Sequence, residues 1–155
     1  MSATKLKSIV GLRKMNGLVW LALLNNKNLH DYESLRGNSN IKFLWIEGGR
    51  NLNNLDFIGE MKSLETLRII NCGKLERLTG LSLPPKLRHI HIHNRLNEIE
   101  SLSFLAEASS LENVYINSLP EKEACYWKAR NREYDYLRND IASCDGIGKT
   151  VSCNR

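Results

Sequence analysis

No apolar run in this sequence is long enough to cross a membrane. The longest, Leu18 to Leu24, is much shorter than the about 20 residues that a membrane-spanning helix needs. The opening residues also lack an apolar stretch of signal-peptide length. We therefore expect neither secretion nor membrane insertion, and we expect the protein in the cytoplasm.

Cysteines and linker-forming residues are also scarce. The four cysteines form no CxxC pair, and a disulfide-dependent fold would have more cysteine in fewer residues. Reduced thiols are therefore expected, with a bridge in the C-terminal tail as the alternative. No stretch rich in glycine, serine or proline divides the 155 residues, so the sequence predicts a single domain over residues 1–155.

Strong charge of one sign is absent as well. The net charge is +5, and lysine and arginine are scattered along the sequence. A nucleic-acid binder typically carries a basic stripe along one face. We interpret the charge mainly as a solvated surface that keeps the domain soluble.

What the sequence does contain is a repeat of 23 or 24 residues. Each unit begins with apolar residues at relative positions one, four and six. The five units start at Leu18, Ile41, Leu64, Leu87 and Leu111. Each such core predicts a short strand, and stacking the units is the way for each strand to bury its apolar side.

The second half of each unit repeats too. Further apolar residues follow at fixed offsets, and we expect them in a helical or irregular segment that returns the chain: Leu29, Tyr32, Leu35, Leu52, Leu55, Ile58, Leu75, Leu78 and Leu81. The same spacing places Leu6, Ile9 and Leu12 one period earlier. Residues 6–15 are therefore expected to cover the open end of the core.

These motifs resemble those of the leucine-rich-repeat family. The family pattern is LxxLxL followed by Asn or Cys and another leucine, and residues 64–75 match it closely. The resemblance covers residues 6–120 and implies an α/β solenoid, an arc of about five parallel strands. It also implies that turn asparagines hydrogen-bond to neighbouring coils, here Asn25, Asn26 and Asn94. The second repeat departs from the pattern with Gly48 and Gly49, and the fifth departs with Ser118, Leu119 and Pro120.

Residues 121–144 show apolar residues at helical spacing, namely Trp127, Tyr134, Leu137, Ile141 and Cys144. We expect an amphipathic helix that caps the last repeat, because a solenoid must close its end. A helix that binds a separate partner is the alternative. Residues 145–155 are expected to form a loose tail.

Alternation along each strand predicts a second, unburied face on the inside of the arc. Its first column is Trp20, Phe43, Thr66, His89 and Asn113. The second is Ala22, Trp45, Arg68, His91 and Tyr115, and the third is Leu24, Glu47, Ile70, His93 and Asn117. Trp, Tyr and Arg are frequent hot-spot residues, and exposed apolar patches usually mark interaction sites. The candidate partner-binding residues are Trp20, Phe43, Trp45, Glu47, Arg68, His89, His91, His93 and Tyr115.

The three histidines of this face could also suggest a metal or catalytic site. His89 and His93 lie roughly 13 Å apart along an extended strand, too far for easy joint ligation. Arg68 is expected beside His91, where its charge would oppose a cation. A ribonuclease-type acid–base pair would need a pocket that an open arc does not supply.

Two further enzyme signals are incomplete. Residues 146–150 end like a phosphate-binding loop but lack its first glycine, its preceding strand and its following helix. Cys72 could be a nucleophile, but the repeat pattern already explains it as a turn residue. We therefore predict no catalytic residue, no metal and no cofactor.

The resemblance, the small size and the aromatic face together predict a non-enzymatic module that binds a protein through its concave strand face. The most concrete hypothesis is an inhibitor or immunity protein that neutralises a toxin domain or enzyme by occlusion, as in a toxin–antitoxin pair. An acidic partner surface would suit the net charge of +5. The alternative is a nucleic-acid-associated factor that stacks bases on its aromatic rings. No membrane partner is expected.

Overall fold

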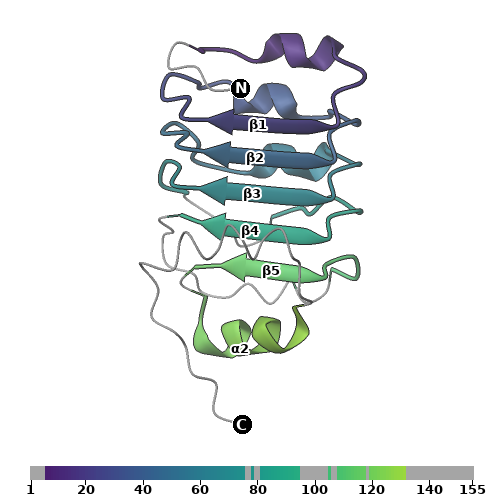
Figure 1. The fold of residues 1–155 in the computed structure, drawn as a ribbon, viewed down its shortest axis with the longest axis vertical. Coiled ribbons are helices and arrows are strands. Elements are labelled where there is room, and N and C mark those ends of the chain that lie inside the picture. The colour runs from purple at the N-terminus through teal and green to yellow at the C-terminus, as the bar shows by residue number, and fades with distance from the viewer. Residues whose placement is uncertain are drawn as a thin grey trace.

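The structure, a computed structural model, describes residues 6–75, 78, 81–94, 105, 108–117 and 119–131. Its sheet consists of five parallel strands hydrogen-bonded in chain order (Figure 1). They are β1 (Trp20–Leu24), β2 (Phe43–Glu47), β3 (Thr66–Ile70), β4 (His89–His93) and β5 (Asn113–Ile116). The parallel sheet predicted from the repeat is thus present, in a solenoid-like α/β arrangement.

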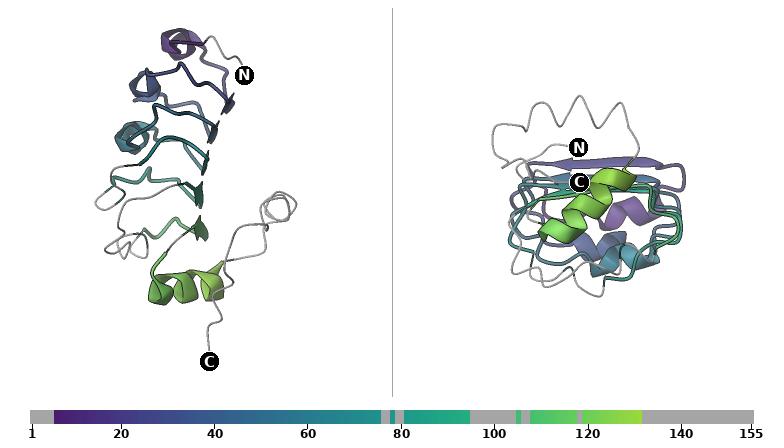
Figure 2. Two further views of the ribbon diagram at one scale, coloured as in Figure 1. Left: turned by 90° about the vertical axis from the view of Figure 1, so that its left-hand side faces the viewer. Right: turned by 90° about the horizontal axis from the view of Figure 1, so that it is seen from below.

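The return segments lie on one side of the sheet. Three of them contain short 3₁₀ helices, which are η1 (Val10–Lys14), η2 (Tyr32–Leu35) and η3 (Asp56–Glu60). Figure 2 shows these helices on one side and the strands on the other, with the chain coiling between them. The opposite side of the sheet is therefore not covered by these helices.

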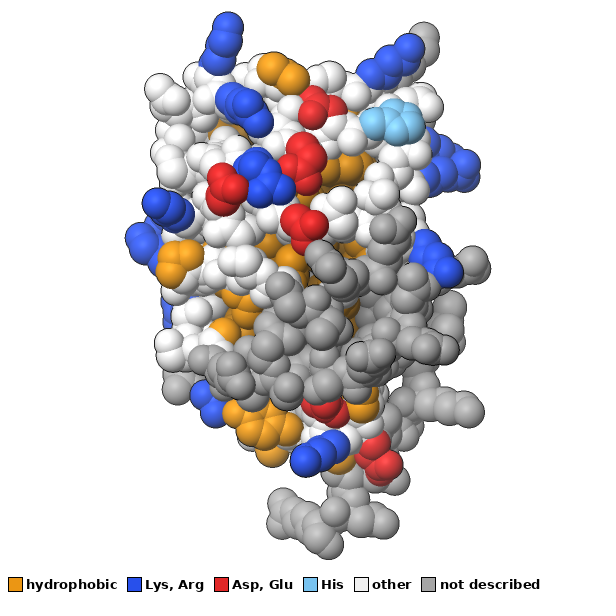
Figure 3. Space-filling model, turned by 180° about the vertical axis from the view of Figure 1, so that it is seen from behind, with side chains coloured by type: hydrophobic (Ala, Val, Ile, Leu, Met, Phe, Trp, Pro, Cys, Tyr) orange, Lys and Arg blue, Asp and Glu red, His pale blue; other side chains and the backbone are white. Residues whose placement is uncertain are grey.

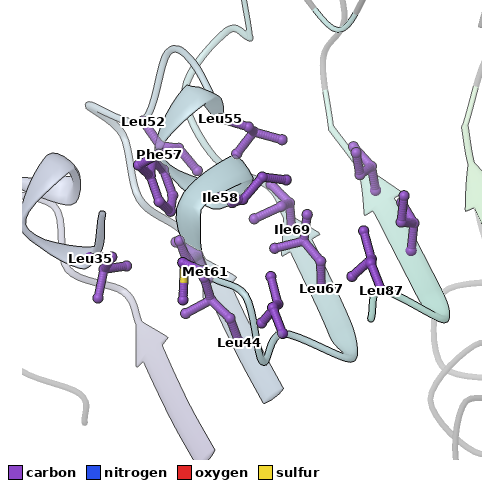
Figure 4. Packing of buried hydrophobic residues seen from close by; sticks show 14 of the residues in the cluster. Leu35, Leu44, Leu52, Leu55, Phe57, Ile58, Met61, Leu67, Ile69 and Leu87 are labelled. Atoms are coloured by element: carbon purple, nitrogen blue, oxygen red, sulfur yellow. The ribbon is translucent and has the colours of Figure 1, made fainter. Parts of the chain in front are cut away.

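The core fills the space between the strands and the return segments (Figure 4). Leu44, Leu67 and Ile69 point inward from the strands and are fully buried. They pack in one cluster with return-segment residues such as Leu55 and Ile58, also fully buried. The predicted apolar positions therefore form one continuous core.

Each of the first three strands ends in a left-handed turn. Asn25 has φ 55°, Gly48 has φ 64° and Asn71 has φ 48°. Asparagine tolerates this conformation better than most residues, and glycine adopts it without steric penalty. At Gly48 a Cβ atom would lie 2.7 Å from Oδ1 of Asn25. The glycine that departs from the repeat pattern therefore provides room for the neighbouring turn.

Side-chain amides join the coils at the later turns. Asn94 accepts a hydrogen bond from the Cys72 N–H (2.7 Å) and donates to the Gly73 carbonyl (2.7 Å). This is the coil-to-coil bonding expected of Asn94. Asn117, which the sequence did not single out for this role, repeats it by accepting from the Asn94 N–H (2.8 Å) and donating to the Asn94 carbonyl (2.9 Å).

Both ends of the described solenoid are covered. At the first end Ile9 and Leu12 are buried, as the half repeat predicted. At the other end α2 (Glu121–Arg130) lies beyond β5 and buries Trp127 (Figures 1 and 2). The helix does not continue as one element to residue 144 as expected, because its C-cap Asn131 leaves the helical conformation. The rest of that prediction, Tyr134 to Cys144 and the tail 145–155, lies outside the described residues.

Asn131 closes the free edge of β5. Its side-chain Oδ1 accepts from the Val114 N–H (2.8 Å), and its Nδ2 donates to the Val114 carbonyl (2.9 Å). One amide side chain thus supplies the pair of bonds that a further strand would make at this residue. An exposed edge invites pairing with other chains, so this cap also protects the sheet.

We expect Asn131→Ala to lower the free energy of unfolding by about 1–3 kcal/mol, because two backbone groups of Val114 lose their partner. Urea denaturation followed by circular dichroism measures the change. Asn16→Ala, at an exposed position outside the helices and strands, should change stability by less than about 0.5 kcal/mol. Equal stability of the two variants would show that the cap contributes nothing.

Two other expectations concern thiols and membranes. Cys72 is a free thiol, but Cys125 on α2 is disulfide-bonded, and its partner lies outside the described residues. Reduced thiols at all four positions were therefore the wrong expectation, and cysteine usage no longer supports a reducing compartment.

Within the described part of the chain, no helix is long and apolar enough to span a bilayer.

Candidate functional site

The strand register brings side by side the candidate residues of the strand face, the side of the sheet opposite the 3₁₀ helices, although the part of this face formed by β3 is buried. One row of paired positions runs through Trp20, Phe43, Thr66, His89 and Asn113. The next row runs through Ala22, Trp45, Arg68, His91 and Tyr115. Leu24, Glu47, Ile70 and His93 form the third row. The columns read from the repeat are thus real neighbours in the structure.

The exposed part of this face begins with a stacked aromatic pair. The rings of Trp20 and Phe43 lie 5.3 Å apart with an interplanar angle of 15°. Phe43 is half-buried, whereas Trp20 remains 54% exposed. Because Trp20 lies on β1, the first strand of the sheet, the row has no further ring of the described chain on the outer side of Trp20.

Arg68 is not the exposed cation that the alternation pattern predicted. Only 3% of its surface is accessible, and its guanidinium lies over the Trp45 ring at 4.4 Å from the centroid. The side chain therefore packs along the face instead of projecting from it. This cation–π contact orients Trp45, whose ring remains half-buried.

The exposure predicted for His89 and His91 is also wrong, since both are buried. His89 pairs with the next strand through a 2.9 Å contact between its Nδ1 and the Asn113 side-chain nitrogen. His91 meets Tyr115 edge to face, with ring centroids 6.2 Å apart. Each histidine is thus engaged by the neighbouring strand.

Glu47, His93 and Tyr115 are half-buried at the margins of the face. Burial raises the pKa of the Tyr115 hydroxyl, so Tyr115 stays neutral at physiological pH. The face therefore combines one exposed ring stack with several partly accessible polar groups.

Burial, opposed in part by the carboxylate of Glu112, lowers the pKa of His89 below its ordinary value. The imidazole is therefore neutral near pH 7. A neutral ring is also what the contact with Asn113 requires, because the Asn113 amide nitrogen can only donate and Nδ1 must then accept.

This depressed pKa predicts a loss of stability in mild acid. The unfolded chain takes up a proton on His89 first as the pH falls through about 6.5, so the free energy of unfolding should decrease between about pH 7 and pH 5. Chemical denaturation across this range measures the slope. His89→Gln should flatten the slope, whereas Asn16→Gln, a non-titrating change at an exposed position, should keep it. An unchanged slope in the His89 variant would contradict the prediction.

A charged ladder beside this face was missed by the sequence reasoning. From the second unit onward, the second residue of each unit alternates in sign, and ion pairs join Lys42 to Glu65 (3.1 Å) and Arg88 to Glu112 (2.7 Å). The alternation at a fixed repeat position was the available signal. A groove of about 650 Å³ adjoins this ladder, and Lys86 and Arg130 also line it. Its lining charges are of both signs, so it selects no ligand charge.

Metal binding finds no support within the described ranges, where no three His, Cys, Asp or Glu side chains are grouped to hold an ion.

Searches for similar proteins add no constraint: no family model, curated protein or solved structure matches this chain. The geometry of the strand face therefore carries the functional argument.

Proposed function

We propose that this protein is a leucine-rich-repeat module that binds a protein partner through the exposed part of its strand face and performs no catalysis. The observation that carries the proposal is the exposed stack of Trp20 on Phe43. The half-buried Trp45, two residues after Phe43 on β2, extends this aromatic surface. Large aromatic side chains bury much area at small entropy cost, which makes them frequent anchors of protein interfaces.

The exposed ring stack favours occlusion over chemistry, because its side chains offer contact area and no reactive group. The face is held by strand pairing and by lateral contacts such as that between Arg68 and Trp45, so it is preorganised. A rigid surface of this kind can cover the active site or the substrate entrance of another protein. An inhibitor or immunity protein acting on a toxin domain or an enzyme of the cytoplasm is the function that fits best.

Affinity purification with variants of the ring stack tests the proposal. We expect wild-type protein to retain one stoichiometric protein from the native cell extract and to inhibit its activity. Trp20→Ala/Phe43→Ala should lose both properties, with binding weakened by about 2 kcal/mol or more. Tyr126→Ala removes an exposed ring from α2 at the opposite end and serves as the matched control.

Circular dichroism must show that all three proteins are folded. Retention of the partner by the folded double variant would place the binding site elsewhere. A partner that keeps full activity when bound would reject occlusion and leave only the binding role.

Nucleic-acid binding is the second candidate, and one observation favours it. Trp20 offers an exposed ring on which a base could stack. Binding to single-stranded oligonucleotides should then weaken steeply as salt is added, because phosphate contacts release counterions. An aromatic-anchored protein interface should depend on salt much less.

A further inference from the structure

Lysine and arginine are scattered along the sequence, but those of the first thirty residues are not balanced by acidic side chains. Residues 1–30 contain five lysines and arginines and no aspartate or glutamate. The remaining residues contain 17 basic and 17 acidic side chains, so the whole net charge of +5 comes from the first thirty residues.

Residues 6–30 of this segment lie at the end of the solenoid opposite α2 (Figure 1). Lys7, Lys14 and Lys27 are exposed, and none of them forms an ion pair with another described residue. Their positive charge is therefore available to a partner.

The acidic groups closest in sequence to this end already have partners. Asp31 accepts a hydrogen bond from the Ser8 hydroxyl at 2.8 Å, and Glu33 pairs with Arg36 at 2.8 Å. Figure 3, which views the return-segment side, shows the alternating charges of this region. Glu33 thus forms an ion pair with Arg36, and Asp31 accepts a hydrogen bond from Ser8. Among the described residues, neither carboxylate forms an ion pair with the exposed lysines of this end.

Apolar exposure is concentrated at the same end. Of the five exposed large hydrophobic side chains among the described residues, Tyr126 lies on α2 and the other four precede residue 21. Those four are Val10 (57% exposed), Met15 (52%), Val19 (48%) and Trp20 (54%). Val19 holds the repeat position that the charged ladder occupies in the later units, and Trp20 is the first ring of the stack. At this end of the sheet, both rows of side chains therefore finish with an exposed apolar residue.

We propose that this basic apolar end, comprising Lys7, Val10, Lys14, Met15, Val19 and Trp20, binds an acidic protein segment that carries an apolar or aromatic anchor. The inference rests on the proposed function in taking the partner to be a protein, and it adds where the partner docks and what chemistry it presents. The anchor covers the apolar side chains, while carboxylates of the segment face the lysines.

Other occupants fit the end less well. A second copy of this chain docking end to end would bring the same unpaired lysines together, and such repulsion opposes association. Nucleic acid would find positive charge and the Trp20 ring, but Val10, Met15 and Val19 are not stacking platforms for bases. A protein segment can also continue from Trp20 onto Phe43 of the adjoining strand, on which Trp20 stacks.

The test uses a random 16-residue peptide library selected against the immobilised full-length protein. We expect the selected peptides to be enriched in aspartate and glutamate together with tryptophan, phenylalanine or leucine. One selected peptide, a version with its apolar anchors changed to serine, a 16-nucleotide single-stranded DNA and vesicles containing anionic phospholipid are then compared in direct binding measurements.

Matched charge reversals locate the site. Lys7→Glu/Lys14→Glu should weaken binding of the selected peptide by about tenfold or more, because attraction becomes repulsion. Lys62→Glu/Lys122→Glu makes the same charge change at exposed positions away from this end and should alter binding by less than about twofold. The serine-substituted peptide should lose at least as much affinity as the end variant.

Separate outcomes overturn the two proposals. Trp45→Ala alters the strand face but not the basic apolar end. If it abolishes peptide binding while Lys7→Glu/Lys14→Glu does not, the strand-face function stands and the inference about the end fails. Selection of basic or uncharged peptides, equal loss in both charge-reversed proteins, or tighter binding of DNA or vesicles also rejects the inference. Failure to enrich any peptide overturns the inference about the end, whereas the affinity purification with the ring-stack variants decides the strand-face function separately.

Discussion

Replacing Leu67 with alanine is expected to lower the free energy of unfolding by about 2–5 kcal/mol, because the removed atoms leave a cavity in the middle of the core. Leu67 is fully buried in the central strand and lies in the same cluster as Ile58 and Met61 of the return segment (Figure 4). Each coil packs only against its neighbours, so damage to the central coil weakens both halves of the solenoid. Urea denaturation of the purified variant measures the loss.

Two control variants separate volume from position. Leu67→Met keeps most of the volume and should lose less than about 1.5 kcal/mol. Val19→Ala removes apolar atoms from a side chain that is 48% exposed, so its effect should remain near about 0.5 kcal/mol. If Leu67→Ala were as mild as Val19→Ala, the core described above would be wrong.

Leu67 also illustrates why the sheet of five parallel strands could be predicted from the sequence. A solenoid core is local and periodic: the residue that fills one coil has an equivalent about 23 residues away, such as Leu44 and Ile90 in the neighbouring strands. The same period that identifies buried positions therefore sets the strand register. Few folds give register from sequence so directly, because most strand pairs are not related by a repeat.

The candidate site was only partly predictable, and Arg68 shows the reason. Alternation along a strand predicts the side of the sheet to which a residue belongs, but exposure on that side depends on neighbouring side chains. Arg68 is long enough to lie over Trp45 on the adjacent strand and becomes buried there. Trp20 has no ring of the described chain beyond it and stays exposed. The exposure of a side chain on this face thus depends on which strand carries it as much as on its residue type.

The ends of the molecule were the least predictable part, because they do not obey the repeat. Asn131 lies outside the repeated units, yet its amide replaces a strand at the edge of β5. The expected helix through residue 144 followed from apolar spacing alone, which carries no information on such a bond. The apolar spacing predicts that the helix continues, but α2 ends at Arg130, and the next residue, Asn131, hydrogen-bonds to the backbone of the sheet edge.

The second large effect is expected for Asn94→Ala, which should lower the free energy of unfolding by at least about 2 kcal/mol. The substitution leaves the Cys72 N–H and the Gly73 carbonyl without the bonds that Asn94 makes to them, and each unsatisfied buried group typically costs about 1–3 kcal/mol. Asn94 itself is 4% exposed. The coil at Gly73 is tightly packed, since a Cβ there would approach the Leu52 carbonyl to 2.8 Å, and water therefore has little room to replace the lost amide. Thermal or urea denaturation provides the measurement.

Two further substitutions at Asn94 distinguish hydrogen bonding from shape. Asn94→Leu retains similar volume without polar atoms, so it should be as destabilised as the alanine variant. Asn94→Asp keeps an acceptor for the Cys72 N–H but places a carboxylate oxygen against the Gly73 carbonyl. That repulsion disappears when the carboxyl group is protonated and can donate, so the deficit of Asn94→Asp relative to wild type should shrink in acid. A leucine variant with wild-type stability would show that the amide bonds between coils contribute nothing, and the coils would then depend on their apolar core alone.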